Sequence, residues 1–220
     1  MNLRLLTAAL LALPLAARAL CTSDGAPQPT AVLERFISAD CADCWRDPAT
    51  PEPAAGTVAV DWVVPGRQGD DAPLSAAALD EAQQRLQALG RPVPVGTDAV
   101  FGRRVGAPLR LRLAQGEPFN DYVGITMELR APGRQAWDAW LLLVEDLPAG
   151  TEGSPVERLL VRNVFRPDWG AQPGRAPKLL SELRAMQIHE GARRDRLRLV
   201  AVLADPQGRI RAISRTACTE

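Results

Sequence analysis

Hydrophobic and polar residues alternate along much of the chain after about residue 104, with the period of two that is typical of half-buried strands. The segment 108–114 (PLRLRLA), for example, alternates leucine with arginine. The pattern predicts six antiparallel strands, at residues 108–114, 122–130, 137–146, 156–165, 195–203 and 209–215. Strands of this kind, joined by short turns, favour a β-sandwich-like domain over residues 105–218. Residues 179–188 (LLSELRAMQI) predict one short helix within it.

The preceding part of the chain has a different pattern. Residues 29–37 predict a short strand, and the nearly continuous apolar run at 56–64 is typical of a strand that is buried on both faces. Residues 74–90 carry an apolar stripe with helical spacing, and a further extended piece follows at 92–102. Strands and a helix in this order predict an α/β domain over residues 29–104. The predicted fold class is therefore α/β plus β.

The chain opens with a leader-like segment. A basic start, an apolar stretch over 5–17 and a small-x-small site at 17–19 predict a secretory signal peptide over residues 1–19. The apolar stretch is shorter than the roughly 20 residues that a membrane-spanning helix requires. A lipoprotein anchor on Cys21 is the alternative, but Leu20 stands where such a motif has a small residue. We expect a periplasmic or secreted protein without stable membrane insertion after cleavage.

Charge and motifs narrow the possible functions. The 220 residues contain 26 basic and 26 acidic side chains, so no basic excess indicates nucleic-acid binding. No glycine-rich phosphate loop and no serine-hydrolase elbow occur, and no cofactor is indicated. The single histidine, His189, borders a charged stretch that is typical of a surface loop. The sequence carries no signal for the oligomeric state.

Four cysteines carry the most informative chemistry. Export predicts an oxidising compartment, and four cysteines allow three pairings. Cys41–Cys44 together with Cys21–Cys218 is the most economical pairing. The second bond would join the two ends of the mature chain and stabilise it by about 4 to 5 kcal/mol in the chain-entropy model.

The C-x-x-C spacing of Cys41 and Cys44 has three interpretations. Redox chemistry requires one exposed sulfur and usually a following helix, but the prolines between 48 and 53 would end a helix that begins at 45–47. A structural zinc site requires four ligands, and His189 is distant in sequence. An inert structural disulfide is the third possibility. For a redox pair we expect Cys41 to be the exposed, attacking residue and Cys44 to be the buried one.

Three carboxylates near the pair bear on its chemistry. Asp40 and Asp43 flank Cys41 and should raise the pKa of its thiol, which predicts a reducing or mildly oxidising couple. Glu34 could relay a proton to or from Cys44. The alternative for Glu34 is an ordinary strand-edge carboxylate.

The segment VLERFISADCADCWRDP resembles the opening of a family of secreted bacterial thioredoxin-like proteins of unknown function. The matching positions are Glu34, Phe36, Ser38, Cys41 and Cys44. VAVDW at 58–62, the helical segment at 74–90 and VRNVFR at 161–166 resemble later motifs of that family, in the same order. The resemblance implies a thioredoxin-like domain followed by a β-rich domain, and it implies no established reaction.

The chain departs from that family pattern at two places. Trp45 and Arg46 replace the prolines that usually follow the second cysteine. The Thr-Pro pair expected opposite the cysteines is Thr97-Asp98 here, unless Pro94 takes the role of the cis-proline. These departures weaken the expectation of a general oxidoreductase.

Two function hypotheses follow. The first is an exported thiol–disulfide exchange protein, an oxidoreductase in which Cys41 attacks, Cys44 resolves and Glu34 assists, with a thiol- or disulfide-bearing protein as partner. The second is a non-enzymatic binding module that keeps Cys41–Cys44 as a structural disulfide and binds a partner through its β domain.

Overall fold

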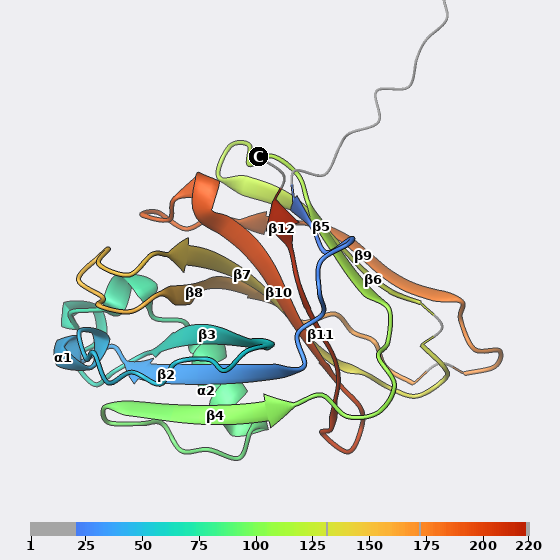
Figure 1. The fold of residues 1–220 in the computed structure, drawn as a ribbon, viewed down its shortest axis with the longest axis horizontal. Helices are drawn as coiled ribbons and strands as arrows, with labels where there is room; N and C mark the ends of the chain where they lie inside the picture. Colours follow the sequence, from blue (N-terminus) through green and yellow to red (C-terminus); the bar gives the residue numbers. More distant parts are fainter. Residues whose placement is uncertain (1–20, 131, 172, 219–220) are drawn as a thin grey trace, which may run out of the picture.

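Two β-sheets dominate the computed structural model, which describes residues 21–130, 132–171 and 173–218 (Figure 1). The strands are β1 (Cys21–Thr22), β2 (Ala31–Ser38), β3 (Thr57–Val64), β4 (Thr97–Arg103), β5 (Leu111–Gln115), β6 (Tyr122–Arg130), β7 (Asp138–Leu147), β8 (Arg158–Phe165), β9 (Leu179–Gln187), β10 (Leu197–Ala204), β11 (Ile210–Arg215) and β12 (Ala217–Cys218). The helices are α1 (Ala42–Trp45) and α2 (Asp80–Ala88), with short 3-10 turns at Gly69–Asp71, Ser75–Ala77 and Arg194–Arg196.

The smaller sheet has the strand order β12-β1-β5-β6-β9, and the larger has the order β11-β10-β7-β8-β3-β2-β4. In the larger sheet, β3 runs parallel to both β2 and β8, and its contact with β8 is a single registered pair, Asp61 with Leu160. The sheet curls, so that the amide of Val105, just beyond β4, donates to the carbonyl of Ile210 in β11. The two edges of the sheet therefore approach each other at one end.

The predicted thioredoxin-like architecture is wrong. The fold is mostly β, and α2 is the only helix of at least seven residues in the described chain. The parallel strands β2 and β3 are connected by the four-residue α1 and a loop, so no thioredoxin βαβ arrangement is evident. Proline removes a backbone donor and clashes with the preceding turn, and the prolines between 48 and 53 account for the short α1.

Strands from both predicted domains, 29–104 and 105–218, meet in the seven-stranded sheet. The boundary between the two domains stays a prediction. The predicted signal peptide, 1–19, lies outside the described residues.

The strands that the alternation predicts are confirmed with shifted ends, but the helix predicted at 179–188 is wrong. This segment forms β9, which pairs with β6 in register along its whole length. Leu180 and Met186 turn inward, while Leu183 stays 81% exposed. Pairing with β6 overrides the local preference, because burial and cross-strand contacts outweigh helix propensities of a few tenths of a kcal/mol per residue.

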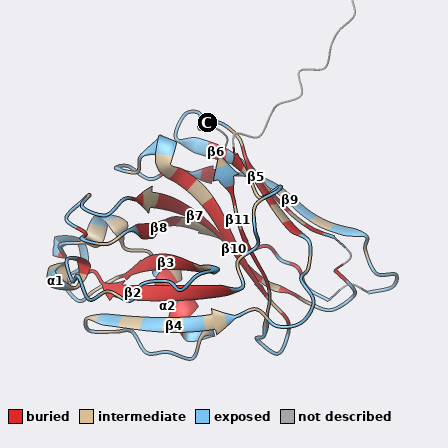
Figure 2. Cartoon of the chain, in the orientation of Figure 1, coloured by how far each residue is buried: buried red, intermediate tan, exposed pale blue. Residues whose placement is uncertain are grey.

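The larger sheet is buried on both faces over much of its width (Figure 2). One face of β7 and β10 packs against the smaller sheet. On the other face, Ala82 and Leu86 of α2 cover a core that includes Phe36 and Trp62. A third cluster, which contains Ile37, Trp45 and other apolar residues, lies next to the end of β2. Among the strands of the larger sheet, β4 alone has no buried residue, as its pale colour in Figure 2 shows.

Candidate functional site

Both predicted disulfides are confirmed. Cys41 and Cys44 are bonded just after the C-terminal end of β2, and Cys21 and Cys218 are bonded where β1 pairs with β12. Two disulfides indicate an oxidising, extracytoplasmic environment. Within residues 21–130, 132–171 and 173–218, no helix has the length and apolar character needed to cross a membrane.

Both cysteines of the Cys41–Cys44 bond are half-buried. The expected division into an exposed Cys41 and a buried Cys44 stays a prediction. Cys41 is the N-cap of α1, and its Sγ accepts a hydrogen bond from the amide of Cys44 at 3.3 Å. A donor that points at Sγ would stabilise negative charge on Cys41 after the bond is broken.

The residue after the pair anchors it to the protein. Trp45 is buried, and its indole Nε1 donates to the carbonyl of Glu152 at 2.8 Å. The guanidinium of Arg158 lies 4.5 Å from the centre of the Trp45 ring, and its Nη2 donates to the Trp45 carbonyl at 2.8 Å. Both ends of this aromatic residue are thereby fixed, and α1 is held against the end of β8.

Arg158 belongs to a buried charge cluster that the sequence analysis missed. Asp61 accepts from Arg35 at 2.6 Å and from Arg158 at 2.7 Å, and the side chains of Asp61 and Arg158 have no exposed surface. Burial lowers the pKa of Arg158, while the charge of Asp61 opposes this shift. The available signal was an acidic residue inside the apolar run VAVDWVV, because a buried charge needs a partner.

Glu34 lies on the opposite face of β2, toward α2. Its carboxylate accepts two hydrogen bonds from Arg85, at 2.6 and 2.8 Å. Burial lowers the pKa of Arg85, but the charge and hydrogen bonds of Glu34 more than compensate and raise it overall. Glu34 makes no hydrogen bond to Cys41 or Cys44 within the described part of the chain, and its role as a proton relay stays a prediction.

The two aspartates beside Cys41 have different roles. The carboxylate of Asp40 accepts from the amides of Arg67 and Gln68, at 2.8 and 3.1 Å, and so holds the following loop. The side chain of Asp43 is fully exposed and lies 3.8 Å from Arg46. Their expected effect on the Cys41 thiol stays a prediction, since Asp40 is engaged elsewhere and water screens Asp43.

The disulfide borders two hollows. A cavity of about 370 Å³ lies between the loop after α1 and strands β2 and β4, with Cys44 in its wall. A shallow depression on the surface is lined by Cys41, Arg67 and Val95, among others. Between them, Gly96 approaches Cys44 so closely that an added Cβ would lie 3.4 Å from its Sγ. The described residues contain no cis peptide bond, so the bond before Pro94 is trans.

The described residues contain no group of three or more His, Cys, Asp or Glu side chains that could hold a metal ion. Comparison of the chain with models of protein families, with curated proteins and with solved structures found no match. The candidate site is therefore defined by its geometry alone. It is a half-buried disulfide that follows a buried strand, and the helix that carries Cys44 is anchored through Trp45 and Arg158.

Proposed function

We propose that the protein is a periplasmic thiol–disulfide exchange protein that works through Cys41 and Cys44. The observation that carries this proposal is the position of the bond, half-exposed between two hollows that a reactant can enter. Exchange requires a thiolate to reach one sulfur of the disulfide. The resemblance of residues 32–48 to a secreted family supports export, and the two disulfides agree with it.

The size of the closed loop also supports reactivity over a purely structural role. Cys41 and Cys44 are three positions apart, whereas Cys21 and Cys218 are 197 positions apart. In the chain-entropy model the short loop stabilises the fold by roughly 2 kcal/mol, and the long loop by about 5 kcal/mol. In this model the long bond stabilises the fold more than Cys41–Cys44 does, and Trp45 and Arg158 also hold α1 in place.

The exchange reaction balances with a partner dithiol. A partner thiolate attacks Sγ of Cys41, the Cys41–Cys44 bond breaks, and Cys44 leaves as a thiolate that takes up a proton. The second partner thiolate then attacks the partner sulfur of the mixed disulfide and releases Cys41. Two electrons pass to the protein, which gains two thiols, and the partner gains one disulfide. The reverse sequence reduces a partner disulfide.

The amide of Cys44 favours Cys41 as the sulfur that carries the mixed disulfide. Its hydrogen bond to Sγ stabilises the Cys41 thiolate, which is the nucleophile of the reverse reaction and the group released in the last step. Cys44, with Gly96 against its sulfur, is the resolving residue.

The test is a redox titration of the folded protein in dithiothreitol and glutathione buffers, followed by acid quench, alkylation and peptide mass analysis. We expect Cys41–Cys44 to be reduced reversibly while Cys21–Cys218 stays oxidised. The Cys44→Ser variant should accumulate a mixed disulfide on Cys41 with glutathione, and the matched Cys41→Ser variant should accumulate much less on Cys44. A Cys41–Cys44 bond that is reduced only when the protein unfolds would contradict the proposal and favour the binding module with a structural disulfide.

A further inference from the structure

Strand β4 is the outer strand of the seven-stranded sheet, and its backbone is unpaired on one side near the disulfide. Within the described chain it pairs with β2 alone. The amide of Ser38 donates to Gly96, and the amide of Arg104 donates to Thr30. These two hydrogen bonds show which residues of the antiparallel pair are hydrogen-bonded to each other. The even-numbered residues of β4 direct their N–H and C=O groups toward β2. Thr97 and every second residue after it direct these groups away from β2, to the open edge of the sheet.

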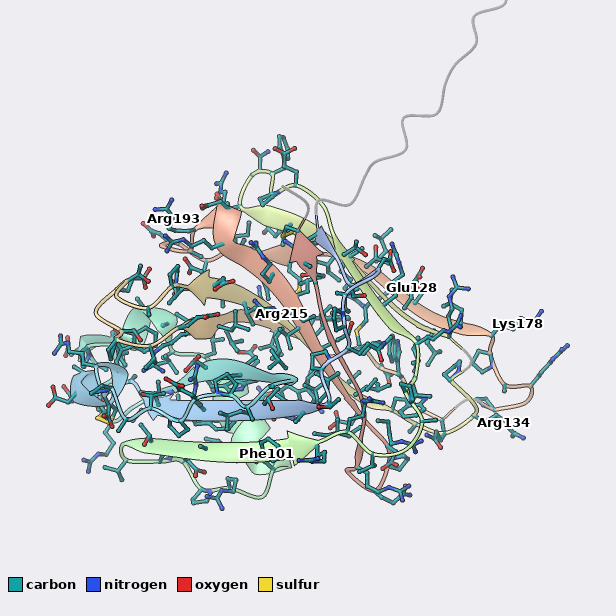
Figure 3. The ribbon with its side chains drawn as sticks, viewed as in Figure 1. Phe101, Glu128, Arg134, Lys178, Arg193 and Arg215 are labelled. Carbon is teal, nitrogen blue, oxygen red and sulfur yellow. A yellow bond between two sulfur atoms is a disulfide. The ribbon has the colours of Figure 1, made fainter. Side chains whose placement is uncertain are left out.

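The same outward residues place their side chains on the open face of the sheet. Thr97, Ala99 and Phe101 are exposed, and Thr97 and Ala99 face the cavity between β4 and the loop after α1. Phe101 is 54% exposed, and Val95, just before the strand, is 84% exposed. We call the surface formed by Val95, Thr97, Ala99 and Phe101 the β4 shelf; Figure 3 labels Phe101 along it.

The β4 shelf begins at the disulfide. Val95 and Cys41 line the same depression, and a Cβ added to Gly96 would lie 3.4 Å from Sγ of Cys44. The cavity beside Cys44 is also lined by Thr97 and Ala99. In Figure 1 the start of β4 lies next to α1, and the strand runs away from it. A chain that lay along the shelf would thus bring one of its residues to the reactive bond.

We propose that the β4 shelf binds an extended, cysteine-containing polypeptide and directs its thiol to Cys41; this inference rests on the proposed exchange function. Outward peptide groups favour a polypeptide as the occupant, because strand addition uses backbone hydrogen bonds that a small thiol cannot make. The exposed apolar side chains of Val95 and Phe101 offer two further contacts to a peptide that lies along β4.

Asp98 limits which part of the open edge of β4 can pair with the backbone of another strand. Its carboxylate accepts from the amide of Ala99 at 2.9 Å and is held by Arg91 through two hydrogen bonds of 2.8 and 2.9 Å. This arrangement occupies one outward donor in the middle of the strand and hinders extended pairing with another sheet, as is typical of protected edges. Pairing next to the disulfide is thereby confined to Thr97, with an apolar contact at Phe101 further along.

The experiment compares two reductants of the Cys41–Cys44 bond. One is dithiothreitol, and the other is a synthetic, uncharged peptide with two cysteines and alternating aliphatic residues. The variants are Val95→Ser and Phe101→Ser. The control is Leu183→Ser, which removes an apolar side chain as exposed as Val95 from the edge strand of the other sheet. We expect the double variant Val95→Ser/Phe101→Ser to slow reduction by the peptide about tenfold, and reduction by dithiothreitol by less than about twofold.

A second peptide tests whether backbone hydrogen bonds to β4 contribute to the reaction. The same peptide, N-methylated on the residues that flank its first cysteine, should reduce the wild-type protein several times more slowly, because methylation removes the donors used in strand pairing. The proposal would be overturned if the double variant slowed reduction by the peptide and by dithiothreitol equally, or if it did not slow reduction by the peptide. Loss of a wild-type dimer in the Phe101→Ser variant would assign the surface to a second copy instead. Failure of dithiothreitol to reduce the folded wild type would refute the exchange function itself.

Discussion

Arg158 is a cation with no exposed surface, and all three of its nitrogens are engaged. Nε donates to Ser154, Nη1 to Asp61 and Nη2 to the carbonyl of Trp45, at 2.7 to 2.8 Å. A buried guanidinium is tolerated only when its donors are satisfied and its charge is matched. The same side chain therefore satisfies the carboxylate of β3 and fixes the helix that carries Cys44.

Removal of this side chain should be costly. We expect Arg158→Met to lower the free energy of unfolding by about 3 to 5 kcal/mol, because Asp61 would keep only Arg35 as a charged partner. Urea denaturation measures the change. The control is Arg193→Met, which breaks an exposed pair with Asp195 and should cost less than about 1 kcal/mol. Similar losses in the two variants would show that the buried cluster contributes no more than a surface ion pair.

At the scale of the elements, the sequence pattern predicted strands better than helices. The alternation that predicts β6 reflects which side chains face the core, because buried residues alternate with exposed or half-buried ones along this strand. The segment of β9 is rich in helix formers, and its strand conformation depends on its pairing with β6, which is remote in sequence. The Cys41–Cys44 pair was recognisable from its spacing. Its support by Arg158 was not, since their contact spans more than a hundred residues.

The turn between β10 and β11 depends on one carboxylate. Asp205 accepts from the side chain of Arg209 and from the amides of Gln207 and Arg209, and Arg211 lies 3.4 Å away. The hydrogen bond from the Arg209 side chain is the main cause that lowers the pKa of Asp205 to about 2; the two amides lower it further, and burial opposes the shift.

This shift predicts a pH dependence. Because the pKa is lower in the folded state than the unfolded value of about 3.9, the ionised Asp205 stabilises the fold fully above that value. The stabilisation is lost as the pH falls through about 2. The difference in unfolding free energy between wild type and Asp205→Asn should therefore be largest near neutral pH and shrink between about pH 4 and about pH 2. A constant difference across a urea series in this range would contradict the assignment.

At the scale of the whole molecule, the two disulfides differ in position and in the length of the loop that each closes. Cys21–Cys218 joins two short strands within the smaller sheet, remote in sequence but adjacent in the ladder. Cys41–Cys44 lies beside the larger sheet and closes a very short loop. In the chain-entropy model the first bond, which closes the longer loop, stabilises the fold more than the second.

Paired serine variants separate the two roles. We expect Cys21→Ser/Cys218→Ser to lower the free energy of unfolding by about 5 kcal/mol and Cys41→Ser/Cys44→Ser by roughly 2 kcal/mol, as the loop lengths require. Guanidinium denaturation under non-reducing conditions measures both. The reverse order of the two losses would identify Cys41–Cys44 as the structural staple and weaken the exchange proposal.

The bond between Cys21 and Cys218 also closes the chain between them into a covalent ring. A protease that cuts one peptide bond in an exposed loop, such as the segment around Gly174, would open this ring without releasing a fragment. The two pieces would stay tethered and keep their pairing in both sheets. In a compartment where proteases are common and thiols are oxidised, such a nicked molecule would retain its shape until a reductant reached the bond.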